Sequence, residues 1–264
     1  MMKSGDSMYS FALAVLAGGM AAIGISGQAQ TIPSATAIPV VFEKTLDAGK
    51  TKPGEIVIAK TTQVVFLPGG QSLLSGATLI GHVVESKALV LSRTPDEAPK
   101  TSDLSVHFDK IVASGSTIPV KLSVRAIAGP VATHEASVLH YRDETDTTGT
   151  RTLIGGSEFS PIGKEIFSST GEVVGYNRKD GIFARLVEMN SPGGDSAVHC
   201  GATGTEQSLG IFSPSACGVY GMNEASISAN GSEGNGTFAL VSTHQSVKLY
   251  ANSSALLQVV GTGL

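Results

Sequence analysis

Two cysteines and six histidines are the residues best suited to bind metals or exchange protons in this 264-residue chain. Cys200 and Cys217 predict a disulfide, because two cysteines in an exported protein most simply pair with each other. Closing a loop of this size contributes roughly 3 kcal/mol in the chain-entropy model. A metal site built from His199, Cys200, Cys217 and His244 is the alternative. Only the adjacent His199 and Cys200 support it, and no CxxC or HxxxH spacing is present.

Other catalytic patterns are weak. His82 and His107 fall on predicted strands that could be neighbours, but a solvent-facing strand histidine is the simpler interpretation. No Gly-x-Ser-x-Gly elbow is present, and no lysine follows the glycines of residues 204–210 in the manner of a phosphate loop. The acidic run 143–146 lacks the EF-hand spacing and predicts a solvated connection. Paired carboxylates for glycoside hydrolysis stay open, because they lie far apart in the sequence of β proteins.

The N-terminus indicates export. Lys3 precedes an uncharged apolar run over residues 11–25, and Gly27-Gln28-Ala29 supplies small residues for a signal peptidase. We therefore predict a signal peptide over residues 1–29, with Gln30 as the new N-terminus. A membrane anchor is the alternative, but the run is short for a bilayer span and is diluted by glycine. We expect no membrane span after cleavage and a location in the periplasm, outer envelope or extracellular space.

Composition predicts an all-β protein. The chain has no Trp, few aromatic residues and 32 glycines, which is typical of many short strands joined by tight turns. The formal net charge is −4, and no basic stripe of the kind that binds nucleic acid is present. We expect no nucleic-acid partner and no cofactor.

A first module is predicted over residues 31–130, as a small β-barrel or sandwich. In residues 104–112 and 118–126 apolar and polar residues alternate, which predicts strands with one buried face. This alternation puts Arg125 on the polar face. In the strand over residues 78–84, Gly81 predicts a bulge or a close approach of another backbone.

A second, disulfide-stapled β module is predicted over residues 152–264, after a polar linker at 131–151. Residues 31–130 carry ten Lys/Arg and eight Asp/Glu, whereas residues 131–264 carry seven and thirteen, and this asymmetry favours a boundary near residue 130. Residues 177–181 end in Asp-Gly and predict a hairpin. Three closing strands are predicted at residues 237–242, 246–251 and 255–260.

Several of these segments resemble a known group. The order Pro53-Gly54-Glu55, then residues 75–83 (SGATLIGHV), 104–111 (LSVHFDKI) and 115–122 (GSTIPVKL), is similar to uncharacterised exported proteins of acidobacteria. The block from Cys200 to Gly221 also resembles the C-terminal part of those proteins. More distantly, residues 31–128 resemble the β-barrel domain of the VirB10/TrbI-type proteins of conjugation and type IV secretion. The resemblance implies a barrel fold and an envelope location, and it does not imply transport.

These observations favour an exported bacterial envelope protein with a non-catalytic structural or protein-interaction role. We expect any partner contact, or self-association, to use an exposed sheet edge or the polar arm at residues 93–102. One alternative is an envelope hydrolase acting on cell-wall or extracellular polymer, with dispersed acidic residues. Another is an accessory of a secretion or conjugation apparatus. The sequence assigns no catalytic, cofactor-binding or metal-binding residue.

Overall fold

The structure is a computed structural model that describes residues 31–91, 100–190, 198–222, 224–228 and 235–261. Strands make up 49% of the structure and helices 4%, which confirms the all-β prediction. The predicted signal peptide at 1–29 lies outside the described residues. Among the helices that are described, none has the length and apolar character needed to cross a membrane.

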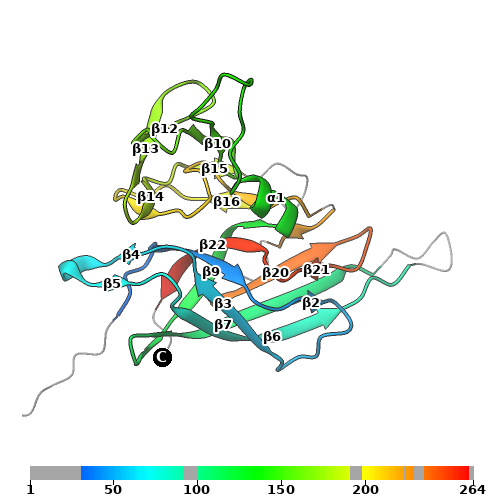
Figure 1. Ribbon diagram of the computed structural model, residues 1–264. Helices are drawn as coiled ribbons and strands as arrows, with labels where there is room; N and C mark the ends of the chain where they lie inside the picture. Colours follow the sequence, from blue (N-terminus) through cyan, green and yellow to red (C-terminus); the bar gives the residue numbers. More distant parts are fainter. Residues whose placement is uncertain (1–30, 92–99, 191–197, 223, 229–234, 262–264) are drawn as a thin grey trace, which may run out of the picture.

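A ten-stranded sheet forms the larger part of the fold (Figure 1). Nine strands follow one path, in the order β18-β9-β22-β1-β3-β6-β7-β20-β19, and β8 adds to β7 beside that path. All neighbours are antiparallel except β18 and β9. The strands are β1 (Ala37–Phe42), β3 (Ile56–Thr61), β6 (Thr78–Lys87), β7 (Ser102–Ala113), β8 (Ser116–Pro119), β9 (Lys121–Ala128), β18 (Gly218–Tyr220), β19 (Ser226–Ile227), β20 (Thr237–Ser242) and β22 (Ser254–Gly261).

A six-stranded sheet, in the order β10-β11-β12-β13-β14-β17, sits above the large sheet in Figure 1. Its strands are β10 (Arg151–Thr152), β11 (Glu158–Phe159), β12 (Glu165–Phe167), β13 (Val173–Arg178), β14 (Gly181–Ala184) and β17 (Gln207–Ser208). The remaining elements are three two-stranded ribbons and two short helices. They are β2 (Leu46–Asp47) with β21 (Lys248–Leu249), β4 (Val65–Phe66) with β5 (Ser72–Leu73), β15 (Met189–Asn190) with β16 (His199–Cys200), η1 (Pro68–Gly70) and α1 (Pro130–Glu135).

The two sheets do not follow the predicted division of the chain at residues 130–152. The small sheet and the β15–β16 ribbon all lie between β9 and β18 in the sequence, and the chain then returns to the large sheet with β18, β19, β20 and β22. The upper part in Figure 1 is therefore formed by an insertion between β9 and β18, and we name the described residues of 129–217 the excursion. Turn spacing and charge balance locate strands along a chain, but they do not say which sheet each strand joins.

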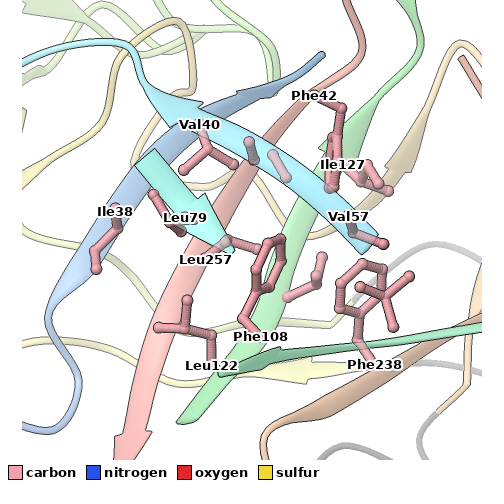
Figure 2. Packing of buried hydrophobic residues seen from close by; sticks show 14 of the residues in the cluster. Ile38, Val40, Phe42, Val57, Leu79, Phe108, Leu122, Ile127, Phe238 and Leu257 are labelled. Carbon is pink, nitrogen blue, oxygen red and sulfur yellow. The ribbon is translucent and has the colours of Figure 1, made fainter. Parts of the chain in front are cut away.

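The large sheet curls around its own apolar core. Alternating residues of its strands point inward, as in β3, where Val57 and Ala59 are buried between exposed or half-buried neighbours. Phe108 lies at the centre, with its ring 6.3 Å from that of Phe42 and 6.4 Å from that of Phe238. Figure 2 shows side chains from separate strands converging there: Ile38, Val40, Phe42, Val57, Leu79, Phe108, Leu122, Ile127, Phe238 and Leu257.

The sheets are not closed into a barrel, and a sandwich-like arrangement describes them better. No hydrogen-bonded ladder joins the two end strands, β18 and β19, in the described part of the chain. The barrel implied by the resemblance, and given as one of two options for the first module, is therefore not formed. The short end strands provide too few backbone partners to complete the ring.

A second apolar core lies between the two sheets. The outer side of β1, β9 and β22, which we name the covered face, contributes Ala37, Ala126, Ala128 and Leu256. Against them pack the large side chains of the excursion: Leu153, Ile154, Phe159, Ile166, Ile182, Leu209 and Phe212. Three alanines in this layer let the second sheet approach closely. The outer side of β3, β6, β7 and β20, which we name the open face, has no such cover from the described residues, and Ile56 and Val84 there are 56% and 46% exposed.

Two local predictions are confirmed. The register of β6 against β7 shifts at Gly81, and a Cβ on that glycine would lie 2.2 Å from the carbonyl oxygen of His107. Gly81 is therefore needed for close approach at a bulge. The predicted hairpin at 177–181 is formed by β13 and β14, and Arg178 pairs with Gly181 across a turn of Lys179 and Asp180.

The predicted face of Arg125 is only half right. Leu257 pairs with Val124 and Leu256 with Ala126, so Arg125 is an extra residue in a β-bulge. The bulge changes the alternation, and Ile127 rather than Ala126 enters the core of the large sheet. Arg125 points away from that core as predicted, but the excursion covers it and it is 2% exposed.

Candidate functional site

Arg125 joins the two halves of the molecule at the seam between the sheets. Its guanidinium donates to four backbone carbonyl oxygens of the excursion: Gly201 at 2.5 Å, Val187 at 2.5 Å, Ala216 at 3.0 Å and Pro214 at 3.2 Å. Burial lowers the pKa of Arg125 to about 10, so the group stays charged at neutral pH. The charge has no carboxylate partner among the described residues, and carbonyl dipoles stabilise it instead.

The predicted disulfide is present next to this arginine. Cys200 and Cys217 are bonded, with 6.0 Å between their Cα atoms. Both are buried, and Cys200 Sγ lies 3.5 Å from the carbonyl oxygen of Arg125. The bridge closes the segment that supplies three of the four carbonyl oxygens bound by Arg125. It therefore holds the acceptors of the buried charge in place.

The alternative metal site at these cysteines is wrong, because both sulfurs are in the disulfide and cannot act as thiolate ligands. His199 contacts Asn190 at 3.1 Å, and His244 contacts Thr243 at 3.1 Å. No group of three or more His, Cys, Asp or Glu is arranged to hold a metal ion within the described ranges.

Gln63 fastens the seam at a second point. Its side-chain amide donates to the carbonyl oxygen of Ile182 at 2.9 Å and accepts from the backbone N–H groups of Ile182 and Gly210, each at 3.0 Å. The side chain thus bonds to β14 as a neighbouring strand would. Ser208 donates to the carbonyl oxygen of Val64 at 2.7 Å, so two consecutive residues of the loop after β3 are bonded to the excursion.

Aromatic contacts extend the seam outward to the surface. Phe66 of β4 stacks on Phe183 of β14, with 5.3 Å between ring centroids. The guanidinium of Arg178 lies 5.5 Å from the centre of the Phe183 ring and 5.8 Å from that of Tyr176. Arg178 also forms an ion pair with Glu206 at 2.9 Å.

Two adjoining hollows lie along this seam. The first encloses about 520 Å³ between the loop after β3 and the β13–β14 hairpin. The second encloses about 440 Å³ at the hairpin itself. Asn177 and Lys179 line both, so we treat them as one surface and name it the seam groove. Its other lining residues are Thr62, Gln63, Val64, Ser75, Arg151, Phe159, Pro161, Lys164, Tyr176, Arg178, Asp180, Gly181, Ile182, Gly210 and Ile211.

The open face carries a separate cluster of titratable groups. His82 and His107 are directly opposite on β6 and β7, as the sequence suggested, with 5.5 Å between ring centroids. His82 Nδ1 lies 3.0 Å from Asp109 Oδ2, His107 Nε2 lies 3.8 Å from Asp109 Oδ1, and His107 Nδ1 lies 3.1 Å from Thr237 Oγ1. The side chains of His82 and Asp109 are 41% and 43% exposed, so the cluster lies on open surface.

In the acidic run at 143–146, the first three residues are exposed and Asp146 is half-buried, as expected for a solvated connection. Its carboxylates cap their own loop. Asp146 accepts from the backbone N–H groups of Arg142, Thr148 and Gly149, and these bonds hold the pKa of Asp146 at about 2. Asp143 accepts from Thr145 and Asp146 in the same way, and the side-chain bond from Thr145 lowers its pKa most.

The predicted arm at 93–102 lies mostly outside the described residues, which resume at Lys100. Lys100 pairs with Val90 and Ser102 begins β7. The residues that hold the seam, Arg125 and Gln63, were not predicted as functional. A charged residue in an alternating strand and a glutamine after a strand are ordinary surface patterns, and no local signal distinguishes these two.

Comparisons of this chain with family models, curated proteins and solved structures gave no match.

Proposed function

We propose that this chain is an exported protein of a bacterial envelope with a non-catalytic structural or protein-interaction role. One observation carries the proposal: the buried polar groups at the seam hold two sheets in a fixed orientation and leave a groove along their join. Arg125 and Gln63 form their hydrogen bonds to backbone groups of the opposite half. A rigid body with a preformed groove suits partner binding, because little ordering entropy is lost on association.

The disulfide supports the export part of this proposal. Disulfides form and persist in oxidising compartments and are rare in the cytosol. The Cys200–Cys217 bridge is buried at the seam, where it supports the binding of Arg125. It fits a protein that matures after export, in agreement with the signal peptide predicted from the sequence.

Photo-crosslinking in the native host tests the interaction role. A photoreactive phenylalanine analogue replaces Tyr176, which lines the seam groove and is 42% exposed. A matched protein carries the same analogue at Lys44, an exposed position after β1. We expect a discrete protein adduct in the envelope fraction from position 176 and none from position 44. Identical adduct patterns at both positions, or none at either, would contradict an interaction role for the groove.

An envelope hydrolase is the second candidate, and the cluster of His82, His107 and Asp109 is the observation in its favour. A histidine oriented by a carboxylate is the arrangement of a general base. The cluster lies on an open sheet face rather than in a cleft, which disfavours it as a catalytic centre. Release of soluble fragments from purified cell-wall polymer by the intact chain, abolished by His82→Ala, would favour the hydrolase.

A further inference from the structure

The charge of the seam groove is opposite to that of the chain segment that builds most of it. Residues 131–264 contain seven Lys/Arg and thirteen Asp/Glu. Four of those seven cations line the seam groove, and among the described lining residues Asp180 is the one carboxylate. The four cations are Arg151, Lys164, Arg178 and Lys179. The acidic half of the chain thus concentrates most of its positive charge at one surface.

The two arginines of the groove already have partners. Arg178 forms an ion pair with Glu206, and Arg151 donates through Nε to the carbonyl oxygen of Ser137 at 3.0 Å. Lys164 and Lys179 form no ion pair with any described residue, and both are exposed. The groove therefore offers two lysine ammonium groups to an incoming anion.

The rest of the lining adds polar and apolar contacts between and beside these charges. Asn177 lies where the two hollows meet and can both donate and accept a hydrogen bond. Thr62 and Ser75 supply hydroxyl groups on the side of the large sheet, and Tyr176 supplies a half-exposed ring. An extended chain with carboxylates and amide groups matches this combination of separated cations and neutral hydrogen-bonding groups.

We propose that the seam groove binds an acidic polypeptide segment of a partner protein, with its Asp or Glu carboxylates paired to Lys164 and Lys179. This inference rests on the proposed interaction role and specifies the chemistry of the partner. The cations left unpaired are lysines, which act as point charges, whereas the arginine forks that suit phosphate are engaged elsewhere. A carboxylate-bearing peptide therefore fits better than a phosphate polymer.

Fluorescence anisotropy with the full chain tests the proposal. The probe is a fluorescein-labelled ten-residue peptide of alternating Glu and Gly, and its control is the same peptide with Gln in place of Glu. We expect the Glu peptide to bind, the Gln peptide not to bind, and the affinity to fall as salt rises from 0.05 to 0.5 M. Lys164→Gln with Lys179→Gln should weaken binding about tenfold, as expected for two exposed charge pairs. Lys44→Gln with Lys52→Gln removes the same charge from positions outside the groove and should change affinity less than about twofold.

Three results overturn the proposal: equal binding of the Glu and Gln peptides, equal losses in the two double variants, or tighter binding of sodium polyphosphate than of the Glu peptide. The last result would assign the groove to phosphate polymers. Failure here is distinguishable from failure of the proposed function. A specific adduct at position 176 without Glu-peptide binding would preserve the interaction role and reject only the acidic partner.

Discussion

The covered face and the open face belong to one sheet and differ in what lies against them. On the covered face, Ala126 and Ala128 are fully buried beneath the excursion, and the neighbouring Arg125 donates to four backbone carbonyl groups of the excursion. On the open face, Ile56 and His82 are opposite each other and exposed to solvent. Both faces are built from paired strands, so the contribution of a residue to the free energy of unfolding depends on whether other residues pack over it. Substitutions on the two faces should therefore have unequal effects.

The largest effect is expected at Arg125. Arg125→Met keeps most of the side-chain length but leaves four carbonyl oxygens without their donor, which should lower the free energy of unfolding by about 3–5 kcal/mol. Urea unfolding followed by far-UV circular dichroism measures this. Arg185→Met, at an exposed position after β14, is the matched control and should cost less than about 0.5 kcal/mol. Similar losses in the two variants would show that Arg125 does not clamp the seam.

Removal of the disulfide should rank next. Cys200→Ser with Cys217→Ser releases the segment that supplies the carbonyl acceptors of Arg125, and we expect a loss of about 3 kcal/mol. The two changes are coupled, because each disrupts the same contacts. Unfolding curves of the triple variant with Arg125→Met should therefore show a smaller total loss than the separate effects combined. Full additivity would mean that bridge and arginine act independently.

A larger side chain on the covered face tests how tightly the excursion packs against it. Ala126→Leu on the covered face forces a larger side chain into the layer between the sheets and should cost about 1–3 kcal/mol. Val84→Leu on the open face, where the residue is 46% exposed, should change stability by less than about 0.5 kcal/mol. Differential scanning calorimetry of both variants measures the two changes in Tm. A neutral Ala126→Leu would indicate that the excursion does not pack tightly on the covered face.

The smallest effect is expected in the histidine cluster of the open face. Asp109→Asn removes the carboxylate that contacts His82 and His107, but exposed pairs of this kind contribute less than about 1 kcal/mol. Unfolding free energies at low and at high salt should be nearly the same for this variant and the natural chain. A loss as large as that of Arg125→Met would contradict the exposed position of this cluster.

Much of the fold could be predicted from local patterns in the sequence. The strand at Thr237–Ser242 has the predicted limits, and the Gly81 bulge and the β13–β14 hairpin form where predicted. Each depends on side-chain alternation or on a residue with special backbone freedom, and both are properties of a few neighbouring residues.

Less of the candidate site could be predicted from the sequence. Cys200 and Cys217 were paired correctly, because two cysteines leave one pairing. The cations of the seam groove come from separate strands and turns, and no local pattern brings Arg151, Lys164 and Lys179 together. The assignment of β18, β19, β20 and β22 to the large sheet has the same origin, since strand partners are chosen by long-range packing.

The sequence by itself determined the secondary-structure class, most strand positions and the disulfide, because alternation, turn residues and cysteine count act locally or by elimination. Only the tertiary structure decided which face of the large sheet is covered. That cover changed Arg125 from a predicted surface residue into a buried charge held by carbonyl dipoles. The physical reason is that burial is a property of the neighbours in space, and here those neighbours come from residues 187–216, more than sixty positions further along the chain.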